Sequence, residues 1–310
     1  MSRVRIATRG SDLALTQANY VARRVQDELA LETELVVVKT TGDRVQEVPL
    51  SQIGGKGLFV KEIEEALLAD RADLAVHSAK DLPAVVAVGL ALVAFPQRED
   101  PRDALVAREP GADLLGLRQG ARVGTGSCRR SAQLLALRPD LKIVPLRGNV
   151  PTRIAKIESE DLDAVVLACA GLDRLGLGDC IAERIAPERI LPAVCQGTLA
   201  LEARQDHLLT AKFAALDDRN ASTAAAAERA FLVRVEGDCT VPLAVHADWT
   251  LDGSLRVRGL VASLDGTKIA RHEERGSSED ASKLGTAVAE AVLEAGGEAI
   301  LRELSEVCPA

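Results

Sequence analysis

The sequence predicts an α/β protein with two doubly covered, largely parallel sheets and an α+β domain at its carboxyl end. Short apolar runs alternate with amphipathic helical segments over the first two thirds of the chain. This alternation restarts after residues 98–103, a polar segment typical of a hinge. From residue 221 onward, a helical segment is followed by strand-like runs and a second helix. Because strand–helix alternation is typical of parallel sheets buried on both faces, we expect two such units and one mixed domain.

The first unit extends to about residue 95. Apolar runs predict strands at residues 4–7, 35–38, 73–76 and 90–94. Helical spacing predicts one helix after the first strand and another before the third. The residues expected on the apolar faces of these helices are Leu15, Ala18, Ala22, Val25 and Leu29, and then Phe59, Ile63 and Leu67.

The second unit follows the hinge. Its expected elements are strands at residues 121–124, 142–145 and 164–168 and helices over 130–137 and 150–157. Two further apolar runs, residues 190–194 and 198–202, are expected to form a second crossing that returns the chain to the first unit.

The end of the chain has a different pattern. We expect a helix from residue 221, antiparallel strands around Ala244, Val257 and Ile269, and a final helix over residues 282–304. The predicted domains are therefore residues 1–97 with 197–217, residues 101–193, and residues 219–310.

The composition restricts the partners. The chain has 310 residues, more than one core usually supports, and a formal net charge of −8. Aromatic residues make up only 2% of it, so platforms for stacking bases are scarce. An acidic protein also repels nucleic acid. We expect no nucleic-acid partner, and we expect local basic turns to bind a small anion.

The cysteines and the amino-terminal residues indicate the compartment. Six cysteines occur without C-x-x-C spacing and four histidines are isolated, so we expect free thiols and no metal site. A strand-like run occupies the place of a secretory peptide, and no apolar run reaches the length of a membrane span. These observations predict a cytoplasmic protein with no membrane partner.

Several short turns combine Gly, Ser or Thr with Arg or Lys. Arg9 follows the first expected strand, Lys80 and Asp81 follow the third, and Arg129 and Arg130 follow the strand of residues 121–124. Open α/β sheets bind ligands at the carboxyl ends of their strands. Small residues let backbone N–H groups approach an anion, and guanidinium groups bind carboxylates with paired hydrogen bonds. The turns therefore predict a site for a polycarboxylate.

Each turn also has a simpler explanation. A lone arginine beside a helix start is often a solvated side chain, and Asp81 alone fits a helix cap. A cysteine such as Cys239 is commonly a small buried apolar group. Residues 54–57 lack the first Gly and the final Ser or Thr of a phosphate-binding P-loop, so nucleotide binding is not indicated.

Ordered motifs decide between these explanations. In chain order they are Arg9, residues 54–59, 77–83, 98–104, 124–130, 146–149 and 170–176, and the turn 236–242 that holds Cys239. Together they resemble the porphobilinogen deaminase family, also called hydroxymethylbilane synthases. The resemblance covers nearly the whole chain.

The resemblance implies a transferase of tetrapyrrole and haem biosynthesis. Such an enzyme joins four porphobilinogen molecules head to tail with release of ammonia, and hydrolysis then frees linear hydroxymethylbilane. Cys239 is expected to carry a dipyrromethane cofactor through a thioether. Asp81 is expected to be the catalytic carboxylate, which stabilises positive charge on a pyrrole nitrogen and shuttles protons.

The resemblance also implies the architecture and the binding residues. Two periplasmic-binding-protein-like α/β domains with a cleft between them, an α+β domain and a monomeric state are expected. The expected cofactor-binding residues are Cys239, Lys80, Asp81, Ser78, Thr125, Ser127, Arg129 and Arg130. The expected substrate-binding residues are Arg9, Ser11, Lys56, Phe59, Arg147, Arg153 and Arg174. Their positive charges suit pyrroles that bear acetate and propionate groups.

Four positions depart from the family pattern. Gln52 stands where a Lys is expected, and Cys128 and Cys195 stand where a Leu and a Gly are usual. Asp238 replaces the Gly that commonly precedes the cofactor cysteine. An acid beside Cys239 disfavours the thiolate, which is the attacking form. Cys128 lies next to the arginine pair and is a candidate second reactive thiol.

Two other function classes stay open at this point. A non-catalytic binding protein that senses a small anion would explain the basic turns, although it gives no role to Cys239 or to a third domain. A transferase that uses Cys239 as an acyl carrier would need a general base near the thiol, and His246 is the nearest candidate in the sequence.

Overall fold

The computed structural model describes residues 3–40, 60–236 and 241–307, which fall into two compact units. Of the described residues, the first unit comprises 3–40, 60–99 and 197–223, and the second comprises 100–196, 224–236 and 241–307. None of the helices within the described ranges combines the length and the apolar character needed to cross a membrane.

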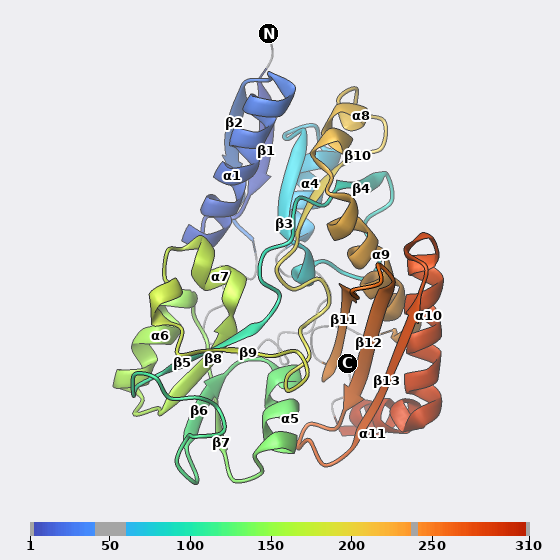
Figure 1. Ribbon diagram of the computed structural model, residues 1–310. Coiled ribbons are helices and arrows are strands. Elements are labelled where there is room, and N and C mark those ends of the chain that lie inside the picture. Colours follow the sequence, from blue (N-terminus) through green and yellow to red (C-terminus); the bar gives the residue numbers. More distant parts are fainter. Residues whose placement is uncertain (1–2, 41–59, 237–240, 308–310) are drawn as a thin grey trace. The chain divides into compact units, whose positions relative to one another are not determined.

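The first unit is built on a five-stranded sheet in the order β2-β1-β3-β10-β4 (Figure 1). Its strands are β1 (Val4–Thr8), β2 (Thr33–Val37), β3 (Leu74–Ser78), β4 (Leu90–Ala94) and β10 (Leu199–Arg204). Its helices are α1 (Asp12–Leu29), α4 (Lys61–Leu68) and α8 (Thr210–Phe213), with the short turns η1 (Ala79–Asp81) and η3 (Ala214–Leu216). Strand β1 pairs in parallel with β2 and β3, and only β10 runs in the opposite direction within this sheet.

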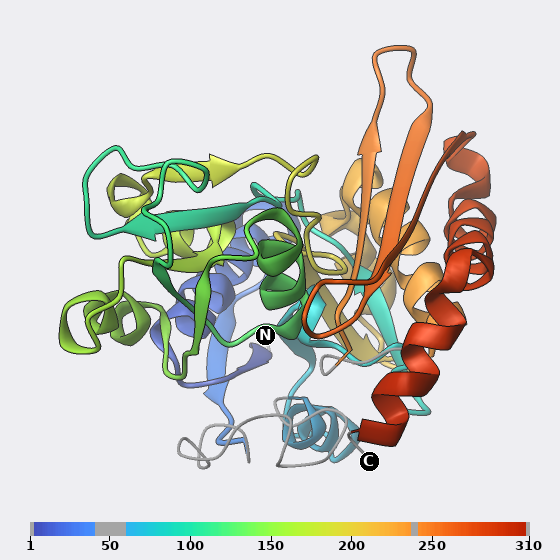
Figure 2. The ribbon, with the colours of Figure 1, turned by 90° about the horizontal axis from the view of Figure 1, so that it is seen from below.

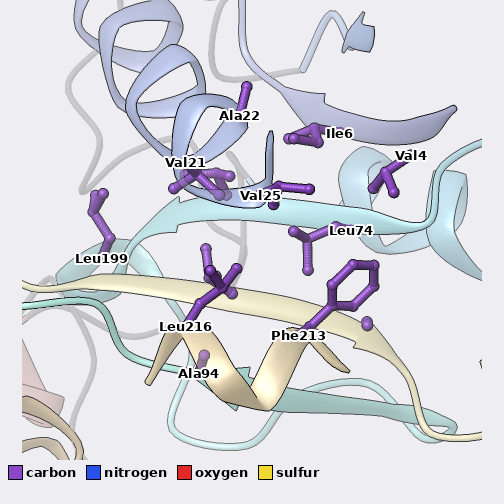
Figure 3. Packing of buried hydrophobic residues seen from close by; sticks show 13 residues of the cluster. Val4, Ile6, Val21, Ala22, Val25, Leu74, Ala94, Leu199, Phe213 and Leu216 are labelled. Carbon is purple, nitrogen blue, oxygen red and sulfur yellow. The ribbon is translucent and has the colours of Figure 1, made fainter. Parts of the chain in front are cut away.

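Helices cover both faces of this sheet. On one face, Ile6 and Leu74 pack against Val21 of α1 and against Phe213 of α8, as Figure 3 shows. The other face is covered by α4, whose Ile63 is fully buried in a second apolar cluster. Alternate residues of a strand point to opposite faces, so one short strand supplies both layers of the core. The doubly covered sheet predicted from the sequence is confirmed.

The second unit contains a sheet of the same design in the order β7-β6-β8-β5-β9. Its strands are β5 (Asp103–Ala107), β6 (Arg122–Thr125), β7 (Lys142–Pro145), β8 (Ala164–Ala168) and β9 (Glu183–Ile185). Its helices are α5 (Cys128–Leu137), α6 (Val150–Ser159) and α7 (Cys169–Arg174), followed by η2 (Gly178–Cys180). Here β5 is the strand that runs against the others. One apolar cluster includes α5 and the other includes α6 and α7, so helices cover both faces of this sheet too.

The remaining elements form an antiparallel sheet with helices, also within the second unit. The strands are β11 (Leu243–Trp249), β12 (Leu255–Ala262) and β13 (Ile269–Gly276), in that order. The helices are α9 (Arg219–Val235), which starts in the first unit, α10 (Ala281–Val292) and α11 (Glu298–Val307), with the turns η4 (Ser278–Asp280) and η5 (Leu293–Gly297). Helix α10 lies along the three-stranded sheet (Figure 2). An apolar cluster joins this sheet to Ala132 of α5.

The predicted fold class is confirmed, with two local corrections. The final helix is two helices, because Gly296 adopts a φ of 108° that an α-helix cannot contain. The strands β5 and β9 were not expected, because polar residues precede β5 and because β9 has only three residues. The three-domain division stays a prediction.

The packing of α10 depends on Gly285. A Cβ atom at this position would lie 2.0 Å from the carbonyl oxygen of Ala227 in α9, a backbone atom that cannot move aside alone. The glycine therefore lets two helix backbones approach closely.

Gly285→Ala is expected to destabilise the protein by about 1–3 kcal/mol, because overpacking here outweighs the gain in helix propensity. Urea unfolding followed by circular dichroism measures the change. Ser282→Ala, at an exposed position of the same helix, is the control and should shift stability by no more than about 0.5 kcal/mol. A gain in stability for Gly285→Ala would contradict the packing argument.

Candidate active site

In the first unit, two basic turns lie at the same edge of the sheet. The parallel neighbours β1 and β3 end at Thr8 and Ser78, so the segments that carry Arg9 and Asp81 leave the sheet side by side. Gln17 of α1 links them, because its Nε2 donates to Ser78 Oγ at 3.0 Å. The segments that carry Arg9 and Asp81 therefore lie at one edge of this sheet.

The turn that carries Asp81 is held by the backbone. Residues 79–81 form a single turn directly after β3, and the Ala79 N–H donates to the Thr198 carbonyl at 3.0 Å. Asp81 and Lys80 are half-buried, so their side chains are accessible. Beneath them, His77 Nε2 lies 3.0 Å from Glu202 Oε2, and both side chains are buried. A fixed turn on a strand end positions a carboxylate well.

Ser11 has a local role in this region. It is the N-cap of α1, where its Oγ accepts from the Ala14 N–H at 3.4 Å. The helix therefore starts just beyond Arg9, which is half-buried. The amino end of a helix favours negative charge, so this position suits an anion.

In the second unit, three basic segments share one edge. The parallel strands β7, β6 and β8 are neighbours, and the segments with Arg147, Arg129 and Arg174 follow their carboxyl ends. The first two segments pack closely, because a Cβ atom at Gly126 would lie 2.4 Å from the Leu146 carbonyl oxygen. Only glycine allows this approach.

The start of α5 is organised by its two polar predecessors. Thr125 is buried and its Oγ1 accepts from the Ser127 N–H at 3.3 Å. Ser127 is the N-cap, and its Oγ accepts from the Arg130 N–H at 3.4 Å. Both residues of the predicted cofactor site therefore set the helix start, which is the role that Ser and Thr commonly have there.

Arg129 and Arg130 share one carboxylate. Arg129 Nη1 lies 2.7 Å from Asp103 Oδ2, and Arg130 Nη2 lies 2.7 Å from Asp103 Oδ1. Arg129 also donates to the Leu191 carbonyl and Arg130 to the Val166 carbonyl. All three charged side chains are buried. Burial by itself raises the pKa of Asp103, but the charges of Arg129 and Arg130 outweigh it and hold that pKa below its usual value.

The other three arginines of the predicted site in the second unit, Arg147, Arg153 and Arg174, are half-buried. Burial lowers the pKa of Arg147, which shows that its charge is partly withdrawn from water. Arg153 Nε donates to the Gly148 carbonyl at 2.7 Å. Arg174 is the last residue of α7. The preceding residue, Asp173, accepts a hydrogen bond from Arg184, and Arg184 also donates to Asp100 in the hinge segment.

The remaining predicted residues lie outside the described ranges. These are Cys239, Lys56 and Phe59, together with the departures Gln52 and Asp238.

The other departures from the family pattern have local explanations. Cys128 is the first residue of α5 and is partly exposed. Cys195 has a φ of 54°, a left-handed conformation that favours glycine, and its N–H donates to the buried carboxylate of Glu228. His246 is buried with its Nδ1 3.6 Å from Glu228 Oε1. Cys128, Cys169, Cys180 and Cys195 form no disulfide with one another.

The sequence did not reveal the residues that hold this site together. Asp103, Gln196 and Glu202 are buried polar residues that contact site residues or their strands. Asp103 lies in a segment predicted to be a hinge, where an acid gives no separate signal. A polar residue inside an otherwise apolar run, such as Glu202 in β10, is the only available clue.

The donor set fits a ligand rich in carboxylates. It combines arginines, lysine and hydroxyl groups at strand ends, and these are donors that bind carboxylates. Among the described residues, no three His, Cys, Asp or Glu side chains lie together in a way that could hold a metal ion.

Fold and site thus define an α/β protein of two similar sheets, with turns that carry arginine, lysine and hydroxyl groups at strand ends. The family model "Porphobilinogen deaminase, dipyromethane cofactor binding domain" matches residues 4–212, and "Porphobilinogen deaminase, C-terminal domain" matches residues 222–294. The chain therefore belongs to the porphobilinogen deaminase family.

The sequences of two relatives match this chain over nearly its full length. The porphobilinogen deaminase of Trichlorobacter lovleyi is 49% identical over 304 residues, which cover 97% of this chain and 96% of the relative. That of Syntrophus aciditrophicus is 50% identical over 311 residues, which cover 99% and 100%. Among solved structures, a substrate-binding domain of a putative amino acid ABC transporter from Streptococcus pneumoniae has a TM-score of 0.44 at 13% identity, covering 69% of this chain and 91% of that one.

Asp100→Asn is expected to lower stability near neutral pH and to have less effect in acid. Burial by itself raises the pKa of Asp100, but the hydrogen bonds from Arg102 and Arg184 outweigh it, so the pKa is lowered on folding. A lowered pKa gives stability that is present above the unfolded value near 4 and is lost as the pH falls.

Urea unfolding at a series of pH values measures this effect. The loss in Asp100→Asn should be about 1–3 kcal/mol at pH 7 and should shrink below about pH 4. Asp161→Asn, whose side chain is 84% exposed, is the control. A loss that stays constant into acid would contradict the assignment.

Proposed function

We propose that the protein is a hydroxymethylbilane synthase that joins porphobilinogen units with release of ammonia in tetrapyrrole biosynthesis. It is a transferase, and its cofactor is dipyrromethane. The observation that carries this proposal is the match of residues 4–212 to a cofactor-binding domain of this family, together with relatives near 50% identity. The basic turns at the strand ends of both sheets support a substrate that bears several carboxylates.

Cys239 is proposed to attach the cofactor through a thioether. When bound, the dipyrromethane supplies the pyrrole carbon to which the first substrate is joined. Ser78, Lys80, Thr125 and Ser127 are proposed to orient its carboxylates and ring nitrogens. Support comes from their placement at the ends of β3 and β6, where backbone and side-chain donors are available.

Asp81 is proposed to be the catalytic residue. Loss of ammonia leaves positive charge on the pyrrole of the substrate, and a carboxylate near the pyrrole nitrogen stabilises this charge and holds the proton. The half-buried side chain of Asp81 on a fixed turn supports this role, because a preorganised carboxylate needs little rearrangement.

The remaining arginines are proposed to bind substrate carboxylates. Arg9, Ser11, Lys56 and Phe59 belong to one set, and Arg147, Arg153 and Arg174 belong to the other. The places of Arg9, Arg147 and Arg174 in the segments that follow β1, β7 and β8 support this proposal, because open α/β sheets bind ligands at the carboxyl ends of their strands. Arg129 and Arg130 are proposed to bind the cofactor.

We also propose that the protein acts as a monomer in the cytoplasm, without nucleic-acid or membrane partners. This proposal rests on the sequence, chiefly on the net charge of −8 and the few aromatic residues. Light scattering on the purified protein measures the mass in solution, and a stable dimer would contradict the monomer.

Asp81→Asn is expected to lower the rate of porphobilinogen consumption by about 100- to 10,000-fold while the protein stays folded. The reason is that the substitution removes the carboxylate that accepts and donates the proton. Consumption of porphobilinogen under saturating conditions measures the effect. Asp206→Asn is the matched control, since its side chain is 85% exposed in the same unit. A near-normal rate for Asp81→Asn would reject its catalytic role.

Intact mass spectrometry tests the covalent attachment. The wild-type protein should be heavier than its bare chain by one dipyrromethane, and Cys239→Ala should have the mass of the bare chain and make no product. Cys180→Ala, at an exposed cysteine, should keep the cofactor. A bare wild-type chain that binds porphobilinogen without converting it would favour an anion sensor instead.

A further inference from the structure

We propose that Asp103 is a positioning residue: it holds the guanidinium groups of Arg129 and Arg130 side by side and leaves one of their two positive charges for a ligand carboxylate. The inference rests on the proposed function, because it takes that ligand to be the pyrrole cofactor.

The geometry shows one carboxylate shared by two cations. Asp103 Oδ1 accepts from Arg130 Nη2 at 2.7 Å and from Arg130 Nε at 2.9 Å, and Oδ2 accepts from Arg129 Nη1 at 2.7 Å. Gln196 Nε2 donates to the same Oδ1 at 2.9 Å. Both oxygens of the carboxylate thus accept from guanidinium groups, and the two guanidinium groups have fixed places.

The neighbouring charged groups do not supply a second counter-ion. The carboxylate of Asp100 is paired with Arg102 and Arg184. Burial raises the pKa of the Cys169 thiol to about 12, so this thiol is neutral at physiological pH. The Leu191 and Val166 carbonyls and Gln196 contribute dipoles but no charge. Within the described ranges, two buried cations therefore share one anion.

Two further observations show that the pair is incompletely satisfied. Arg129 Nε is buried and has no hydrogen-bond partner among the described residues. Burial lowers the pKa of Arg130 even though it contacts Asp103, so the shared carboxylate does not compensate for the loss of water. A buried, undercompensated cation is unfavourable, and a ligand carboxylate would relieve this cost.

The position in the fold explains why an acid is needed. Both arginines lie in the first turn of the ten-residue helix α5, where the helix dipole disfavours positive charge. Asp103 is the first residue of β5, the strand that leaves the hinge, and it pairs with Ala168 of β8. A rigid strand therefore delivers the carboxylate to the helix start, and the arginines keep their places before any ligand binds.

The test compares cofactor attachment in two variants of the full chain, prepared without cofactor and incubated with porphobilinogen. In Asp103→Asn, attachment at Cys239 should be about 10- to 100-fold slower by intact mass, because a charged hydrogen-bond partner is lost. Asp163→Asn is the matched control, since Asp163 also accepts two hydrogen bonds from one arginine and one from a backbone N–H in the same unit. It should attach cofactor at the wild-type rate.

A second variant separates positioning from folding. Asp103→Ala leaves space for a small anion, so sodium formate should restore part of the attachment rate and of the melting temperature, whereas sodium chloride at the same ionic strength should not. If Asp103→Asn does not fold, this rescue is the deciding measurement. Wild-type attachment in folded Asp103→Asn, or equal effects of formate and chloride, would overturn the inference.

The same measurements separate the two proposals. A wild-type chain that never acquires dipyrromethane overturns the proposed function. If the wild-type chain and the Asp103→Asn chain acquire dipyrromethane equally fast, only the role of Asp103 is overturned.

Discussion

Strand direction is the constraint on which the candidate site depends. Strands β1 and β3 of the first unit, and β7, β6 and β8 of the second, are parallel neighbours, so their carboxyl ends deliver consecutive loops to one edge of each sheet. Loops that are far apart in the chain therefore lie next to each other at this edge. The Gln17–Ser78 hydrogen bond and the close approach of Gly126 to Leu146 are the contacts that record this convergence.

The reversed strands connect this geometry to the hinge. In each sheet one strand runs against the others and occupies the fourth place in the order, β10 in the first unit and β5 in the second. Strand β5 begins at Asp103, the last residue of the polar segment 98–103, and β10 begins at Leu199, just after the chain has returned to the first unit at Gly197. The segments that cross between the units therefore continue directly into strands of the two cores.

Ion pairs connect several elements of the second unit. Asp100 binds Arg102 and Arg184, and Arg184 in turn binds Asp173 at the helix that ends with Arg174. Three residues further along, Asp103 binds the two arginines at the start of α5. One short segment thus restrains two helices that carry proposed binding residues. Ion pairs of this kind fix orientation even where their net contribution to stability is small.

The sequence by itself determined the elements and the chemistry. Strands at residues 90–94, 142–145 and 164–168 have the predicted bounds, because each is an apolar run between turns. The types of residue in the turns were enough to indicate a carboxylate ligand. Only the tertiary structure decided which groups meet: Asp103 lies 26 residues from Arg129, and a contact over that separation leaves no local pattern. It also decided that both arginines are buried, since burial depends on neighbours brought by the whole fold.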